Sequence, residues 1–159
     1  MIDDQDLRHL ERCVELAAEA VGAGDEPFGS LLVTADGRVA REDRNRVNSA
    51  NDATRHPEFE LARWAATHLD AGERATATVY TSGEHCPMCS TAHAWVGLGR
   101  IVFATSSAQL TEWKRELGLS SSPIRPLSIH DTAPNLETDG PVEQFAVRLK
   151  QLHRRAGTN

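Results

Sequence analysis

The chain has 159 residues, of which 40% are hydrophobic and 25% are charged, and its formal net charge is -6. This length suits one globular domain with a buried core over residues 1–159, whereas the acidic balance argues against a protein that grips phosphate backbones. The sequence has no apolar run long enough for a membrane span, no signal-like start, and three cysteines. These features exclude a disulfide framework and favour the reducing cytoplasm.

The first half of the chain predicts two helices and a hairpin. Apolar residues recur at helical spacing over 4–22, and the cluster Gly22-Ala23-Gly24-Asp25 ends this helix. A buried strand at 30–35 and a turn at Asp36-Gly37 lead into a second strand at 38–43. The polar residues 44–55 indicate a loop, and a helix that begins near His56 ends at Asp70-Ala71-Gly72.

The second half alternates between the two kinds of element. The predicted elements are a strand at 76–82, a helix at about 86–96, a strand at 100–105, a helix around 110–117, a weak strand at 124–129 and a last helix at 141–154. Strands that alternate with helices predict an α/β layer architecture.

Cys86 and Cys89 form a C-x-x-C pair between a predicted strand and a predicted helix, and three interpretations compete for it. A redox pair would cycle between dithiol and disulfide, and the helix dipole would lower the pKa of one thiol. A structural zinc site would need two further ligands. Cys13 is the other thiol, but it lies on the apolar face of the first helix, where a free cysteine usually packs as a small hydrophobe.

The third interpretation is a catalytic metal site. His56 and Glu58 form an H-x-E motif at the start of another predicted helix, and the interval from His56 to Cys86 has room for one helix and one strand. Both helix starts can therefore face one crevice. Two thiolates and one imidazole leave the fourth position of a zinc ion open for water, and Glu58 can hold the proton that the water gives up.

H-x-E followed by P-C-x-x-C is the signature of zinc-dependent base deaminases, and the chain matches all of it except the proline before the first cysteine. The chain resembles the cytidine deaminase-like superfamily over roughly half its length. The segments that carry the resemblance are this motif, Glu26-Pro27-Phe28-Gly29, residues 44–58, residues 81–89 and "GRIVF". Within it, the chain is most similar to bacterial guanine deaminases and to tRNA adenosine deaminases. The resemblance implies a three-layer α/β/α sandwich with a mixed five-stranded sheet, and a homodimer.

The resemblance also implies the roles of the motif residues. His56, Cys86 and Cys89 would bind one zinc ion per chain, with water as the fourth ligand. Glu58 would be the catalytic residue, taking a proton from the zinc-activated water and passing it to the ring and to the departing amine. The reaction would release ammonia from the amino-bearing ring carbon.

Substrate contacts carry over from the family in the same way. Asn45 would read polar atoms of the base, Phe28 and Trp95 would form walls of the pocket, and the backbone carbonyl of Glu84 would accept from the leaving amino group. Asn45 could instead cap a turn, and the two aromatic residues could be ordinary core residues. Two helix glutamates fall where guanine deaminases place a substrate-reading acid: Glu112 and Glu116.

Two positions depart from the family pattern. Pro57 stands where relatives commonly carry alanine, so a backbone N–H that often donates to the substrate is missing, although proline also suits the first turn of a helix. His85 replaces the usual proline before the first cysteine. The sequence therefore predicts the chemistry of the family with an altered substrate site.

These features lead to a zinc hydrolase that deaminates a free nucleobase, a small molecule: guanine, a modified or isomeric purine, or a cytosine or triazine analogue. The alternative substrate is a tRNA adenosine, a nucleoside or a nucleotide, for which the arginines of the 41–55 region and of the C-terminal tail would supply the positive charge. A nucleic acid partner is not expected at this net charge. An inactive zinc-stabilised binding module is the alternative of another class, and Glu58 argues against it.

Overall fold

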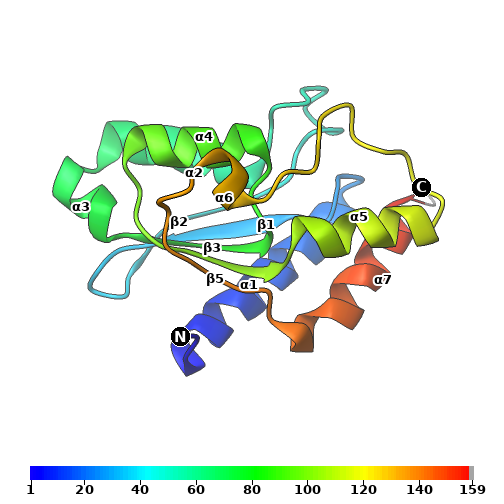
Figure 1. Cartoon of the computed structure of the whole chain (residues 1–159), viewed down its shortest axis with the longest axis horizontal. Helices are drawn as coiled ribbons and strands as arrows, with labels where there is room; N and C mark the ends of the chain where they lie inside the picture. The colour runs from blue at the N-terminus through cyan, green and yellow to red at the C-terminus, as the bar shows by residue number, and fades with distance from the viewer. Residues whose placement is uncertain (158–159) are drawn as a thin grey trace.

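The computed structural model describes residues 1–157, and it contains a five-stranded mixed sheet (Figure 1). Thr158 and Asn159, with which the predicted domain ends, lie outside the described residues. The strands are β1 (Gly29–Val33), β2 (Val39–Arg44), β3 (Thr78–Gly83), β4 (Ile101–Thr105) and β5 (Thr138–Asp139), in the order β2-β1-β3-β4-β5. The β1 strand is antiparallel to both β2 and β3, whereas β3, β4 and β5 are parallel.

Helices cover both faces of this sheet, as Figure 1 shows. On one face lie α1 (Asp4–Gly22), α5 (Ser107–Glu116) and α7 (Ala146–Gly157), preceded by a 3₁₀ turn at Glu143–Phe145. On the other face lie α2 (Pro57–His68), α3 (Ala71–Thr76), α4 (Pro87–Val96) and α6 (Ile129–Thr132). The predicted α/β/α sandwich with a mixed five-stranded sheet is confirmed.

The alternation of side chains along the strands supplies both layers with a core. Leu31 and Tyr80 face α1 and α7, whereas Leu32 and Val79 face α2. The core under α1 is especially close, because a Cβ on Gly29 would lie 2.3 Å from Leu16 Cβ. Glycine at the start of β1 therefore allows helix and strand to approach each other.

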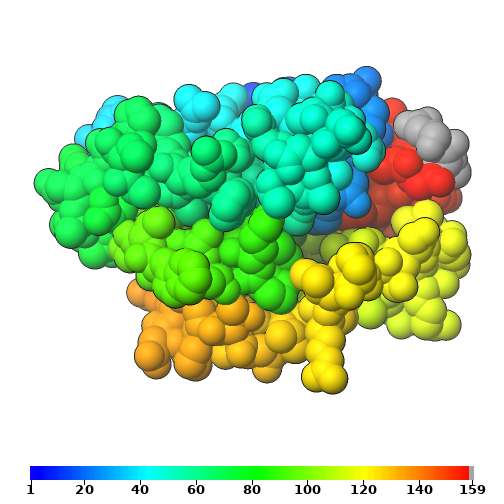
Figure 2. All heavy atoms as spheres, turned by 90° about the horizontal axis from the view of Figure 1, so that it is seen from above, coloured from blue at the N-terminus to red at the C-terminus, as the bar shows by residue number. Residues whose placement is uncertain are grey.

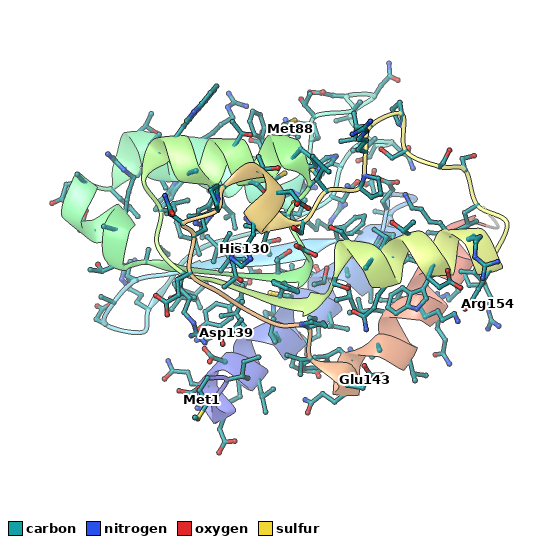
Figure 3. All side chains as sticks on the ribbon, viewed as in Figure 1. Met1, Met88, His130, Asp139, Glu143 and Arg154 are labelled. Carbon is teal, nitrogen blue, oxygen red and sulfur yellow. The ribbon has the colours of Figure 1, made fainter. Side chains whose placement is uncertain are left out.

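A partly buried ionic network attaches the short strand β5 to the sheet. Arg100 lies 3.0 Å from Asp6 of α1 and 2.7 Å from Asp139 of β5. Tyr80 donates to Asp6 at 2.7 Å, and the amino group of Met1 donates to Asp139 at 3.1 Å. Figure 3 shows Met1 and Asp139 on the same side of the molecule. These contacts hold a strand that is too short to be fixed by its own ladder.

The predicted strand at 124–129 is wrong. Residues 117–128 form no regular element, and Ile129 begins α6 instead. Pro126 offers no backbone N–H to a ladder, and Ser128 caps α6 by accepting from the N–H of Asp131. The apolar residues of this segment therefore resemble a strand only in composition.

Capping residues account for other differences from the predicted boundaries. Asp70 and Glu73 form a capping box, so a short helix, α3, follows the predicted stop at residues 70–72. Ser106 and Gln109 form another, and α5 begins there, before the predicted start near residue 110. Among residues 1–157, no helix is long and apolar enough to cross a membrane.

We predict that the buried histidines make the fold sensitive to acid. Burial lowers the pKa of His93 to about 4, and burial together with the charge of Lys114 lowers the pKa of His153 to about 3. The unfolded chain binds protons on these rings below its ordinary pKa of 6.5, so stability is full above that pH and falls toward acid. The loss is about 1.4 kcal/mol per pH unit for each ring.

Urea unfolding at about pH 7.5 and about pH 5 measures this loss. In His153→Phe, which keeps an aromatic ring beside Phe28, the difference between the two pH values should shrink by about 2 kcal/mol. The control is His68→Phe, because His68 is exposed on α2. Equal pH dependence in the wild type and in His153→Phe would contradict the assignment.

Candidate zinc site and active site

The candidate site lies at the N-termini of two neighbouring helices. His56 is the N-cap of α2 and Cys86 is the N-cap of α4, and α2 packs against α4 on one face of the sheet. Neither side chain makes a capping hydrogen bond, and each is followed by a proline at the first helical position, Pro57 and Pro87. Proline is well suited to that position. The two N-cap side chains are thus left to serve as ligands.

The geometry of the three predicted ligands fits a tetrahedral metal. His56 Nδ1 lies 3.7 Å from Cys86 Sγ and 3.7 Å from Cys89 Sγ, and the two sulfur atoms are 3.6 Å apart. Tetrahedral zinc bonded to sulfur and imidazole nitrogen separates its ligand atoms by about 3.5 to 3.8 Å. A disulfide would need a sulfur separation of about 2.05 Å. The predicted set of ligands is therefore brought together as zinc ligands.

The electrostatics of the site favour a divalent cation. Hydrogen bonding with Cys89 lowers the pKa of Cys86 to about 4 against the effect of burial, so Cys86 is a thiolate at neutral pH. The same neighbour, together with burial, raises the pKa of Cys89. Two thiolates in contact repel each other, and a dication allows both to ionise. Two soft sulfur ligands and one imidazole are a donor set that zinc prefers.

Cys13 is not part of this cluster. It is fully buried in the core between α1 and the sheet, and burial raises the pKa of its thiol. Among the described residues, the cluster of candidate metal ligands consists of His56, Cys86 and Cys89. The interpretation of Cys13 as a small hydrophobic residue agrees with this position.

Glu58 lies beside the ligands, on the first turn of α2. Its Oε2 is 3.7 Å from Cys89 Sγ, and its Oε1 accepts from Thr81 Oγ1 at 2.8 Å and from Ser30 Oγ at 3.1 Å. Burial raises the pKa of Glu58. One carboxylate oxygen is therefore held by two hydroxyl groups while the other faces the ligand cluster.

Sequence reasoning missed the two hydroxyl residues that hold Glu58. Ser30 and Thr81 are cross-strand partners on β1 and β3, both are fully buried, and both face α2. One signal was available in the sequence. Ser30 is two positions from Leu32 and Thr81 is two positions from Val79, so each hydroxyl residue is a polar residue on the strand face that packs against α2. Only the register of β1 against β3 brings the two positions together.

Asn45 is buried, and its amide is oriented by the backbone. Its Oδ1 accepts from the N–H of Val47 at 3.0 Å, while Nδ2 has no partner among the described residues. Because a backbone N–H can only donate, the amide must place Nδ2 on the other side. Asp25 fixes the surrounding loop by accepting from the N–H and the hydroxyl of Ser49 at 2.8 and 2.7 Å. The Nδ2 group of Asn45 is thus a buried donor without a partner among the described residues.

Phe28 and Glu84 flank the turn that leads to Cys86. The ring of Phe28 lies edge-on to His153 of α7 at 5.3 Å, and a Cβ on Gly83 would be 2.9 Å from it. The backbone N–H of Glu84 donates to Thr105 O at 2.7 Å, so the turn is tied to the end of β4. Both residues are thus close to the ligand loop in the fold.

His85 points into the protein. It is 1% exposed, and its ring lies edge-on to His93 of α4 at 5.3 Å. Neither ring nitrogen has a partner among the described residues, and burial lowers the pKa of His85, which keeps the ring neutral. The residue that replaces the usual proline is thus a packed neutral ring.

The family follows from the region that contains these residues. Residues 3–105 match the family model of the cytidine and deoxycytidylate deaminase zinc-binding region. The chain belongs to this family. His56, Glu58, Cys86 and Cys89 all lie within the matched region, and the site is that of a zinc-dependent deaminase.

Curated relatives of this deaminase differ in the substrate that they name. The chain is 38% identical to the guanine deaminase of Bacillus subtilis over 104 residues. The aligned region covers 65% of this chain and 66% of that protein. The chain is 30% identical over 117 residues to a protein of Schizosaccharomyces pombe described as a probable cytosine deaminase, which covers 74% of this chain and 70% of that one. The chain thus spans about two thirds of the length of these relatives.

Solved structures agree on the fold. A guanine deaminase from Nitrosomonas europaea aligns with a TM-score of 0.74 at 19% identity, over 100% of this chain and 87% of its own. The B. subtilis guanine deaminase aligns with a TM-score of 0.60 at 27% identity, over 84% of this chain and 91% of its own. The layered architecture of the deaminase is therefore shared with both.

Three residues that the resemblance placed near the substrate lie on the surface of the fold, and one of them, Trp95, shares a shallow hollow with Pro87 and Met88, which lie between the two cysteine ligands. Trp95 is 86% exposed and lines an open groove between α2 and α4. Glu112 pairs with Arg115 within α5, and Glu116 pairs with Lys150 of α7. Both glutamates are thus paired with basic side chains of α5 and α7.

We predict that zinc binding requires the imidazole and both thiols of the cluster. His56→Ala and Cys89→Ala should each lower the zinc content from about one ion per chain to about a tenth or less, because two remaining ligands cannot hold the ion. Elemental analysis of the purified proteins measures this ratio. Cys13→Ala is the matched control, since it removes a buried thiol outside the cluster. Full zinc content in His56→Ala would refute the ligand assignment.

Proposed function

We propose that this deaminase acts on a free nucleobase and releases ammonia by hydrolysis. The first candidate is guanine or a modified or isomeric purine, followed by cytosine or a triazine analogue. The position of Glu58 carries the proposal: a buried carboxylate oxygen lies 3.7 Å from a ligand sulfur. A purely structural zinc site has no use for such a group, whereas a hydrolytic site needs one.

Proton transfer by Glu58 is the step that this chain supplies. A zinc ion held by His56, Cys86 and Cys89 lowers the pKa of water and makes it a nucleophile at neutral pH. Glu58 accepts a proton at Oε2, because Oε1 is occupied by the hydroxyl groups of Ser30 and Thr81. Its raised pKa lets it hold that proton and return it to the ring and to the departing amine.

Substrate recognition rests on a small set of polar groups. Asn45 Nδ2 donates, so the base must present an acceptor toward it. The backbone carbonyl of Glu84 accepts from the amino group that leaves, and Phe28 supplies an aromatic wall. Pro57 has no N–H to give. The pocket therefore offers the base the donor of Asn45 but no backbone N–H at position 57, and it favours a base that does not need this second donor.

The charges around the site support a free base over a tRNA. Of the four arginines between residues 41 and 55, Arg44 lies 3.0 Å from Asp25 and Arg46 lies 3.3 Å from Asp43, so these two are already paired with carboxylates. In the tail, Arg148 pairs with Glu11. Phosphate binding depends on uncommitted positive charge, and the net charge of -6 opposes it. The similarity to the B. subtilis guanine deaminase, at 38% identity, points the same way.

The proposal includes one domain in the reducing cytoplasm. Helices α1 and α7, from the two ends of the described chain, pack into the same core. All three cysteines are free, and two of them serve as thiolate ligands. Such thiols persist in a reducing compartment.

We predict that the zinc-loaded protein releases ammonia from one base of a defined panel. The panel contains guanine, 8-oxoguanine, isoguanine, adenine, cytosine, isocytosine, a triazine, the common nucleosides and a tRNA. Turnover of a free base is expected, because the site offers a donor to a ring acceptor and little free positive charge. Glu58→Gln should keep its zinc and lose activity by about a thousandfold or more.

The other outcomes are equally informative. Faster turnover of a nucleoside or of the tRNA would preserve the chemistry and reject the free-base substrate. Undiminished activity of Glu58→Gln would reject the proton transfer step. Absence of ammonia from the whole panel, with zinc present, would favour the binding module.

A homodimer is also part of the proposed function. The groove between α2 and α4 has a volume of about 540 Å³, and its lining combines apolar residues such as Phe59, Trp64 and Trp95 with the charged residues Arg41, Glu60 and Arg63. An exposed tryptophan beside these residues on a protein surface is typical of an interface. The two helices that form the groove also carry the zinc ligands, so the partner subunit would lie close to the site.

We predict that Trp95→Glu converts the dimer to a monomer. The new charge would be buried without a counterion in the interface, which opposes association. Light scattering during size-exclusion chromatography measures the mass directly. The control is Val147→Glu, because Val147 is 70% exposed on α7, on the other face of the sheet. A monomeric wild type, or a dimeric Trp95→Glu, would refute this interface.

A further inference from the structure

The side chain of Glu84 joins the first residues of two helices. Its Oε2 accepts from the N–H of Ser107 at 2.7 Å, and its Oε1 accepts from the N–H of Ile129 at 2.8 Å. Ser107 begins α5 and Ile129 begins α6. The serine caps of these helices bond to later N–H groups, those of Gln109 and Asp131. Glu84 therefore satisfies donors that the caps leave unpaired.

The Glu84 carboxylate connects the two ends of a long chain segment, because α5 precedes residues 117–128 and α6 follows them. Between α5 and α6, residues 117–128 form no regular element, and both helices start at the same side chain. Figure 2 shows this segment in yellow beside the start of α4 in green and the 45–55 loop in cyan to teal, around one hollow of the surface. The ligands at the starts of α2 and α4 lie at this end of the molecule.

Glu84 is also part of the turn that carries a zinc ligand. Its N–H is bonded to Thr105 O at 2.7 Å, and Cys86 follows two positions later. Helix α6 in turn packs against α4. Residues 117–128 are thus connected to the ligand loop through the Glu84 carboxylate as well as through the packing of α6 on α4.

We propose that Glu84 is a positioning residue whose carboxylate holds residues 117–128 as the outer wall of the substrate cavity. This inference rests on the proposed function, because the wall contacts the part of a base remote from the reacting carbon. The reacting carbon must lie at the zinc ligands, so a bicyclic base extends further toward the wall than a monocyclic one. The clamp therefore contributes to the affinity for purines more than to that for pyrimidines.

Both carboxylate oxygens are needed for the clamp. A glutamine keeps one acceptor but turns an NH₂ group toward the second helix N–H, and an alanine loses both bonds. The two oxygens of a carboxylate can also accept both backbone N–H groups at once. Glu84→Gln and Glu84→Ala thus weaken the clamp in two steps, and neither removes the backbone carbonyl.

The first test is steady-state kinetics on the bases that the wild type deaminates. In Glu84→Ala, KM should rise about tenfold or more while kcat changes by about threefold or less, with full zinc content. Glu84→Gln should fall between this variant and the wild type. The rise should be larger for a bicyclic base than for a monocyclic one. An unchanged KM, or a loss of zinc in step with activity, would overturn the proposal.

The matched control is Glu73→Ala. Glu73 also pairs with a backbone N–H at a helix start, accepting from Asp70 at 2.8 Å, and Figure 1 shows α3 at the end of the molecule opposite the 117–128 segment. Its loss should leave KM unchanged. A KM that rises equally in Glu73→Ala would mean that any lost cap disturbs the site.

Hydrogen exchange tests the clamp without a substrate. The amides of residues 107–129 should exchange about tenfold faster or more in Glu84→Ala than in Glu73→Ala, because two helix starts are released. Unchanged exchange would overturn the clamp. If the wild type deaminates no base, the proposed function fails while the exchange still decides the clamp. Faster exchange with an unchanged KM would show that Glu84 stabilises the two helix starts but that residues 117–128 do not form a wall of the substrate cavity, and it would overturn the proposal.

Discussion

Concentrated negative charge inside an apolar sandwich is the constraint on which the site depends. Two thiols and the Glu58 carboxylate are within contact of one another, with Cys89 and Glu58 deeply buried. Ionised groups in such a place need a cation, helix N-termini and hydrogen-bond donors around them. The starts of α2 and α4 supply the N-termini, and zinc supplies the positive charge.

The sheet determines where these groups meet. Because β1 and β3 are antiparallel, the beginning of one strand lies beside the end of the other, and Ser30 is placed opposite Thr81. Side chains alternate along both strands, so these hydroxyl groups face α2 and reach Glu58, while their neighbours fill the core under α1. One face of each strand thus serves the chemistry and the other serves stability.

Local patterns in the sequence were sufficient for most elements and for the zinc ligands. Helix periodicity and glycine clusters can be recognised from neighbouring residues alone. Few kinds of site use a histidine, a glutamate and two cysteines at the spacing of His56, Glu58, Cys86 and Cys89. Ser30, Thr81 and the side-chain role of Glu84 depend on strand register and on chain segments far apart in sequence, which no local pattern contains. The strand expected at 124–129 failed for the opposite reason: its composition was apolar, but Pro126 and the cap at Ser128 decided the backbone.

The three cysteines lie in environments that make them independent reporters. Cys13 is sealed in the core under α1, Cys89 is a buried ligand, and Cys86 is a partly exposed ligand at a helix start. A reagent that modifies thiolates is therefore excluded from Cys86 by bound metal, and from Cys13 and Cys89 by the fold itself. The number of thiols that react thus distinguishes a metal-loaded chain, a folded metal-free chain and an unfolded chain in one titration.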